Sequence, residues 1–340
     1  MRSWRLLILP FLLGALTACG ASPTPAAPTG SGGLSGTLQG RVVDGLTDSG
    51  LAGIRVSGGI QPVVSQTAGN FALNPVFEDE YGATYTFTGS AIVERKTALR
   101  SAGAAAIVPL IPASFDLQAF DQMFRPTQLQ RWRTAPPLRI EMRTGQFTDI
   151  NALSATMLEN KMSDADKDAL VVDLTWALPQ LTGNTFTAFA SATTQTSEPD
   201  TAIPILNTGI ITVIRLKGLT AGTGFWGYSR WRFLSDGTIS GGLITLDEDF
   251  ELSQHPRRRA LRAHELGHAL GMGHVTGRVS IMNANISVFE PNEFDKQAAR
   301  IAFQRPPGNR APDTDPIGYS TNSRAGGGGV GVGRWSDAIR

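Results

Sequence analysis

Three of the four histidines in this 340-residue chain lie within eleven consecutive residues, the segment HELGHALGMGH at 264–274. Histidine is the commonest metal ligand near neutral pH. Residues four apart on an α-helix lie one turn above each other, so His264 and His268 can direct their rings at one ion. Gly271 can end that helix and let His274 supply a third ligand from a loop. Three imidazoles leave a fourth tetrahedral position open for water, which is typical of catalytic zinc sites.

Glu265 follows the first of these histidines and is rotated from it by about 100° around the helix axis. Its carboxylate therefore lies beside the ion, where a general base for a metal-activated water belongs. A bare HExxH pattern has a real false-positive rate, because an isolated histidine is more often a core or surface residue. The pattern here extends to HExxHxxGxxH, and Met282 follows His274 by eight residues, in SIMN.

This motif pair resembles the metzincin clan of zinc peptidases, in which the methionine lies in a turn beneath the metal. The short link from His274 to Met282 and the segment GGLITLDEDF at 241–250 are similar to the matrixin group. The resemblance implies one catalytic zinc ion on the three histidines, Glu265 as the catalytic residue and Met282 as an apolar floor. It also implies that the chain hydrolyses peptide bonds in a protein or peptide substrate.

The substrate is expected to lie extended and to add its backbone to a sheet edge near the active-site helix. The strand expected to receive it comprises Gly242, Leu243, Ile244, Thr245 and Leu246. Residues 283–294 would wall the pocket after the cut, and the apolar Ile286 and Phe289 indicate a hydrophobic substrate side chain there.

The chain also departs from the matrixin pattern. Thr245 stands where matrixins have a histidine for a structural zinc ion, so a second zinc site is not expected. The acids Asp247, Glu248 and Asp249 could hold calcium, but a solvated acidic turn is the favoured interpretation. Matrixins are kept latent by a cysteine on the zinc, and the one cysteine of this chain is Cys19. If Cys19 is acylated, the mature chain has no free thiol, so that form of latency cannot operate.

The N-terminal segment MRSWRLLILPFLLGALTAC has two arginines, a short apolar run and then small residues, which is the layout of a secretory signal. Its ending, LTAC, resembles the bacterial lipoprotein box, in which cleavage precedes a cysteine that is then acylated. We expect a signal peptide at 1–18, lipidation at Cys19 and a flexible Pro/Gly/Ser-rich tether at 19–35. An ordinary signal peptide is the alternative. Gly20 favours the outer membrane or cell surface, with the membrane contacted only through the lipid.

The pattern of residues 36–340 predicts a multidomain protein. Residues 36–112 hold short β-branched runs between turns, which predict an all-β sandwich that resembles the carboxypeptidase-regulatory-like fold and serves as a binding module or a folded spacer. Residues 113–307 predict an α/β (α+β) catalytic domain of metzincin type, with a mixed sheet, a helix capped by Ser163 and the active-site helix. The basic run at 257–262 is expected to be the exposed start of that helix. Residues 308–340 are expected to be a Gly-rich disordered tail.

Composition limits the partners. The formal net charge is +1, which gives no argument for binding nucleic acid, and we expect a monomer. The favoured function is an exported, lipid-anchored zinc endopeptidase. The alternatives are a surface adhesin whose peptidase domain is vestigial and a zinc hydrolase that acts on another bond. The intact set of three ligands, Glu265 and Met282 argues against a vestigial site.

Overall fold

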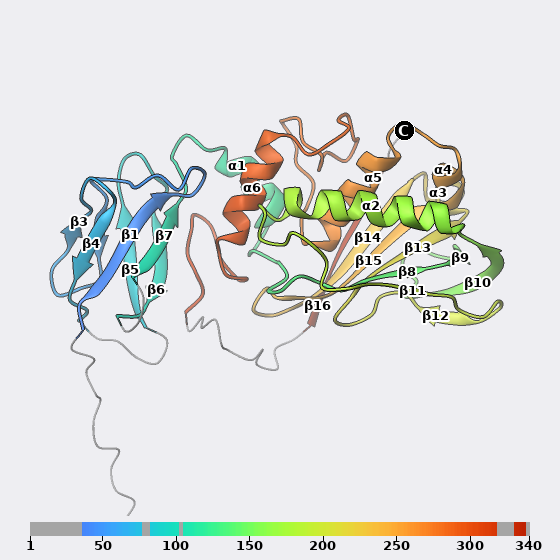
Figure 1. Cartoon of the computed structure of the whole chain (residues 1–340), viewed down its shortest axis with the longest axis horizontal. Coiled ribbons are helices and arrows are strands. Elements are labelled where there is room, and N and C mark those ends of the chain that lie inside the picture. Colours follow the sequence, from blue (N-terminus) through green and yellow to red (C-terminus); the bar gives the residue numbers. More distant parts are fainter. Residues whose placement is uncertain (1–35, 77–81, 102–104, 318–329, 338–340) are drawn as a thin grey trace, which may run out of the picture. The chain divides into compact units, whose positions relative to one another are not determined.

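The computed structural model describes residues 36–76, 82–101, 105–317 and 330–337 (Figure 1). The predicted signal peptide, Cys19 and the tether lie outside the described residues. Within the described segments, no helix is long and apolar enough to cross a membrane.

Residues 36–112 form two small sheets around one apolar cluster. One sheet has the order β4-β1-β7 and the other β3-β2-β5-β6. Their bounds are β1 Leu38–Asp44, β2 Arg55–Ser57, β3 Val63–Val64, β4 Asn70–Leu73, β5 Ala83–Thr88, β6 Arg95–Leu99 and β7 Ala106–Leu110. Alternate residues of β5, including Tyr85 and Phe87, are fully buried, as expected for strands with one face on a core. The likeness to the carboxypeptidase-regulatory-like fold stays a prediction.

A third, nine-stranded sheet is mixed and has the order β12-β10-β9-β13-β15-β14-β16, with β8 beside β13 and β11 beside β8. The bounds are β8 Leu138–Glu141, β9 Arg143–Gln146, β10 Ser154–Lys161, β11 Ala192–Gln195, β12 Ala202–Pro204, β13 Ile211–Lys217, β14 Gly227–Leu234, β15 Ile239–Asp247 and β16 Val330–Asp337. β15 runs parallel to β13 and antiparallel to β14, and β14 is antiparallel to β16. The predicted mixed α/β architecture is confirmed.

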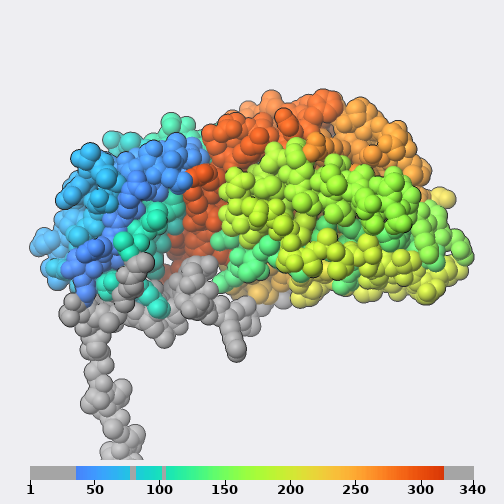
Figure 2. All heavy atoms as spheres, in the orientation of Figure 1, coloured from blue at the N-terminus to red at the C-terminus, as the bar shows by residue number. Residues whose placement is uncertain are grey.

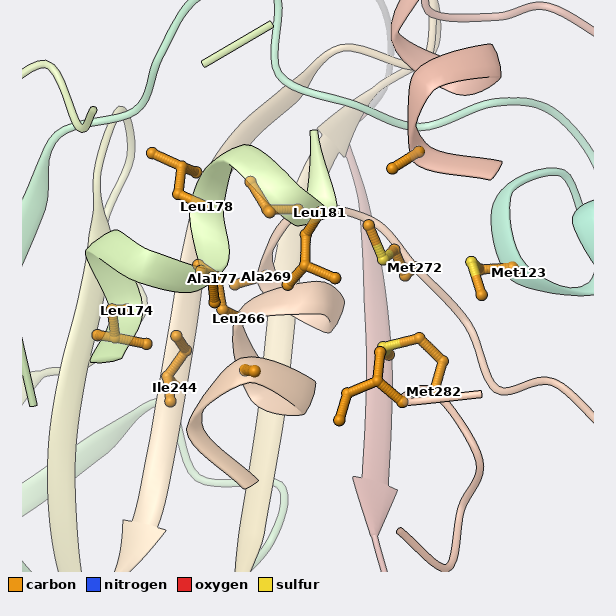
Figure 3. Packing of buried hydrophobic residues seen from close by; sticks show 14 of the residues in the cluster. Met123, Leu174, Ala177, Leu178, Leu181, Ile244, Leu266, Ala269, Met272 and Met282 are labelled. Carbon is orange, nitrogen blue, oxygen red and sulfur yellow. The ribbon is translucent and has the colours of Figure 1, made fainter. Parts of the chain in front are cut away.

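Six helices accompany this sheet in the described part of the chain: α1 Leu117–Phe124, α2 Asp164–Leu181, α3 Leu219–Thr223, α4 Glu248–Leu252, α5 Arg258–Ala269 and α6 Glu293–Phe303. α5 packs against β14 and β15, and α2 packs against α5 (Figure 1). Leu266 and Ala269 of α5 point toward Ala177 of α2 in the shared core (Figure 3). The outer side of α2 lies at the surface in the space-filling view (Figure 2). α5, which carries the histidine motif, is therefore the buried inner helix.

The helix ends follow local sequence signals. The Ser163 hydroxyl accepts the Asp166 N–H at 3.1 Å, which caps α2 as the sequence predicts. α5 begins two residues after Pro256, at Arg258, and it ends just before Gly271. Gly271 has φ 101°, and a Cβ there would collide with the backbone oxygen of Gln130, so only glycine fits this turn.

The expectation of a disordered tail from residue 308 is wrong for two segments. Within 308–317, Asp313 is fully buried, and it accepts a hydrogen bond from Arg305 at 2.7 Å and lies 3.6 Å from Arg95 of β6. Residues 330–337 form β16, which pairs with β14 along its whole length. Composition misled the prediction because buried ion pairs order the first segment, and backbone hydrogen bonds, which need no apolar side chains, order the second.

Candidate metal centre

The three predicted ligands meet at one point. One ring nitrogen from each of His264, His268 and His274 lies within 4.8 Å of the others. His264 and His268 come from the same face of α5, and their Nε2 atoms are 2.9 Å apart. Both are fully buried, whereas His274, in the segment after Gly271, is partly exposed. The i, i+4 spacing and the turn at Gly271 thus produce the predicted cluster.

Backbone carbonyls fix the orientation of the two helical rings. His264 Nδ1 donates to the Ile281 oxygen at 2.6 Å, and His268 Nδ1 donates to the Met272 oxygen at 2.7 Å. A carbonyl can only accept, so Nδ1 carries a proton, and Nε2 is the ring nitrogen that faces the cluster. Two imidazoles oriented in this way beside a third are a donor set that fits zinc with an open coordination position.

The turn that holds His264 is itself anchored by a buried acid. Asp295, in the first turn of α6, accepts the Ile281 N–H at 2.9 Å and the Ser280 hydroxyl at 2.5 Å. Burial raises the pKa of Asp295, although these hydrogen bonds favour its charged form. Ile281 therefore connects Asp295, through its N–H, with His264, through its carbonyl oxygen.

Met282 lies fully buried beside α5 (Figure 3). A Cβ on Gly267 would lie 2.5 Å from the Met282 sulfur, so the methionine packs directly on the helix backbone between the two helical ligands. The Val275 N–H donates to the Met282 oxygen at 2.9 Å, which ties the methionine turn to the residue that follows His274. The glycine of the motif therefore makes room for the methionine.

Two residues of β14 contact the predicted general base, and sequence reasoning missed both. Ser229 Oγ donates to Glu265 Oε2 at 2.6 Å, and both residues are fully buried. A Cβ on Gly227 would lie 2.8 Å from Glu265 Cδ and closer still to Oε1. Gly227 and Ser229 are two residues apart in a strand and so share one face. Two small residues at this spacing in the otherwise bulky GYSRWRFL were the available signal.

The predicted substrate strand is wrong in its position. Gly242, Leu243, Ile244, Thr245 and Leu246 belong to β15, and each is paired with β13 on one side and with β14 on the other. An interior strand has no free backbone edge, so a peptide cannot add to it. The strand itself was predicted correctly, but its neighbours in the sheet depend on long-range pairing. Beyond β15 on this side, the sheet continues with β14 and ends at β16.

The acidic segment before α5 is not a solvated turn. Asp247 accepts the Phe250 N–H and the Thr220 N–H, each at 2.9 Å, and Glu248 accepts the Thr144 hydroxyl at 2.6 Å. Asp247 and Glu248 are buried, so they cap and cross-link the sheet. Calcium binding stays a prediction.

Two further expectations near the site also fail. Arg262 is not part of an exposed helix start, because it is buried and paired with Glu251 and Asp173. Ile286 is 1% exposed and belongs to the core, so it does not line a substrate pocket, whereas Phe289 is exposed. In both cases tertiary neighbours, and not the local sequence, decide the exposure.

The site opens on the side of His274. A depression of about 910 Å³ lies there, between α1 and the segment after the third histidine. Besides His274, it is lined by Leu117, Gln118, Asp121, Gln122, Arg125, Pro126 and Thr276. His264 and His268 lie deeper, so this is a route by which solvent can approach the cluster.

Comparison with known proteins gives one family. The family model described as Matrixin matches residues 114–301, which include all of the residues of the cluster. No curated protein matches the chain. Among solved structures, a type II cohesin–X-dockerin complex from Acetivibrio cellulolyticus is similar, with 18% sequence identity and a TM-score of 0.18. That match covers 24% of this chain and 59% of the other.

Proposed function

The chain belongs to the matrixin family of metallopeptidases, and we propose that it is a zinc endopeptidase that cuts peptide bonds in protein or peptide substrates. The observation that carries the proposal is the convergence of three histidine nitrogens within 4.8 Å, with the adjacent Glu265 held by Ser229. A vestigial site would not need to keep ligands, base and supporting contacts together. For this reason we favour catalysis over an adhesin role.

His264, His268 and His274 would hold the zinc ion. When bound, the ion supplies a Lewis acid, which lowers the pKa of water towards about 7 and polarises the scissile carbonyl. Glu265 takes a proton from the attacking water and later delivers it to the nitrogen of the leaving amine. Ser229 positions the Glu265 carboxylate through its hydrogen bond from β14. The buried, water-poor surroundings of Glu265 strengthen these electrostatic interactions.

We also propose that the substrate backbone adds to β14, at the edge that β16 fills in this structure, instead of to β15. β14 lies beside Glu265 at its Gly227 end, and an extended peptide pairs with a strand through main-chain hydrogen bonds. Side chains of the peptide then alternate between the two faces of the sheet, and one of these faces is the site.

Export and lipid anchoring remain part of the proposal, and they rest on the sequence of residues 1–19. The protein would be held at the bacterial outer membrane or cell surface through Cys19 and act there as a monomer. Replacement of Cys19 by Ser is expected to release it from the membrane fraction. Membrane association that persists in this variant would contradict the lipid anchor.

The catalytic proposal is tested with the full chain, because residues 308–317 and β16 pack on the described fold. Peptide-library cleavage and zinc content are measured for the parent and for Glu265→Gln and His268→Ala. We expect the parent alone to cut, Glu265→Gln to keep zinc without cutting and His268→Ala to lose zinc. Equal cutting by the parent and Glu265→Gln would exclude Glu265 as the base.

A further inference from the structure

β14 is the last strand of the sheet on the side of the catalytic site, apart from β16. Its first residue, Gly227, lies against the Glu265 carboxylate, and α5 packs across it. Any peptide that is to lie along the sheet and reach Glu265 must therefore use the outer edge of β14. That edge has one row of backbone donors and acceptors, which one strand can fill.

The C-terminal strand β16 already fills this row. It runs antiparallel to β14, with eight consecutive pairs from Gly227↔Asp337 to Leu234↔Val330. Neighbouring strands lie about 4.8 Å apart, so the backbone of Asp337 is one strand spacing from the residue that contacts Glu265. β16 thus has the position and the backbone pairing that an extended substrate would need.

We propose that β16 is an internal competitor of the substrate, which restrains cleavage until it leaves the edge of β14. The inference rests on the proposed function and names the regulation of the same site. Residues 113–307 contain no cysteine, so no thiol of the catalytic domain can bind the metal as an alternative restraint.

The sequence of the strand suits reversible pairing. Gly331 and Gly333 fall within β16, and glycine in a strand costs conformational entropy without adding side-chain contacts. Loss of β16 from the edge would leave the rest of the sheet in place, because β14 keeps its full pairing with β15. Displacement therefore requires only the β14–β16 pairing to break.

The size of the restraint follows from effective concentration. A strand tethered by a short segment competes at a local concentration on the order of 1 mM. If a free peptide with the sequence of β16 binds the edge of β14 with a dissociation constant of about 100 µM, the tethered strand lowers kcat/KM of the intact chain about tenfold. Removal of the strand should therefore raise kcat/KM about tenfold, mainly through KM.

The test compares the zinc-loaded full chain with a variant that ends at Ile317. A synthetic peptide of residues 330–340 is then added to the shortened variant. The control peptide has prolines in place of Val332 and Gly333. Backbone N–H groups point to alternate sides along a strand, so the N–H group of either Val332 or Gly333 must face β14. Proline has no N–H group, so the substitution removes that hydrogen bond and weakens the pairing.

We expect the shortened variant to cut peptides about tenfold faster and the 330–340 peptide to inhibit it competitively, with the proline peptide much weaker. Equal rates for the two chains would overturn the inference while leaving the proposed function intact. A shortened variant that loses activity and thermal stability, and regains both when the peptide is added, would make β16 a structural strand and also overturn it. Zinc-loaded chains that both fail to cut would refute the proposed function itself.

Discussion

The contact between Gly227 and the general base leads to a sharp prediction for Gly227→Ala. The added Cβ would lie 2.8 Å from Glu265 Cδ. Carbon atoms in ordinary contact are about 3.5–4.0 Å apart, so the carboxylate must move by about 1 Å. A displacement of that size at a reacting group costs roughly 100-fold in rate, or about 3 kcal/mol of transition-state stabilisation. The carboxylate is the far end of a flexible side chain, so the stability of the fold should change little.

The assay measures kcat/KM on a peptide substrate, zinc content and Tm. Gly242→Ala is the matched control, because its Cβ would lie 3.0 Å from Ile211 Cγ1 and 3.3 Å from Ala269 Cβ, under the same helix but away from Glu265. We expect Gly242→Ala to lower Tm by a few degrees through overpacking and to keep kcat/KM within about threefold. Gly227→Ala should keep zinc and Tm and lose about 100-fold in kcat/KM.

Two results would refute this reasoning. If Gly227→Ala kept zinc and retained kcat/KM within about threefold of the parent, Glu265 would not need its present position. If Gly242→Ala lost as much activity as Gly227→Ala, the loss would come from packing under α5 and not from the base.

Three other predictions concern the surroundings of the site. Ser229→Ala removes the hydrogen bond to Glu265 and should lower kcat about tenfold with zinc retained, whereas loss of zinc would show that the serine supports the fold instead. Arg230 is fully buried and donates to the backbone oxygens of residues 150–152, so Arg230→Met should lower the free energy of unfolding by about 2 kcal/mol in urea titrations and make that loop easier to cleave with chymotrypsin, which can cut after Phe147 or Leu153. An unchanged urea midpoint would contradict this role. Burial would raise the pKa of Asp313, but Arg305 and Arg95 outweigh it and lower the pKa to about 2. Asp313 therefore adds about 2 kcal/mol of stability above pH 4 that is lost as the pH falls through about 2, and Asp313→Asn should flatten the pH dependence of unfolding in that range. An equally steep acid profile in this variant would assign the effect to other acids.

The sequence determined the local parts of this protein. The spacing of His264 and His268, the helix end at Gly271 and the cap at Ser163 are set by residues within one or two helical turns, and all three are found where the pattern predicts them. Helical geometry is fixed by short-range hydrogen bonds, so such features can be predicted without knowledge of the rest of the fold. The run GYSRWRFL at 227–234 likewise forms one strand, β14, over its whole length.

Only the tertiary structure decided which strands are neighbours and which buried groups meet. Ser229 contacts Glu265, which lies 36 residues later in the sequence, and β16 pairs with a strand about a hundred residues earlier. Asp313 pairs with Arg95 of β6, in the four-stranded sheet of residues 36–112. Sheet order and register depend on long-range backbone pairing, which any extended segment can offer and the local pattern does not specify. For this reason β15 was predicted as a strand and misplaced as an edge, and the glycine-rich tail was not expected to form a strand beside the site.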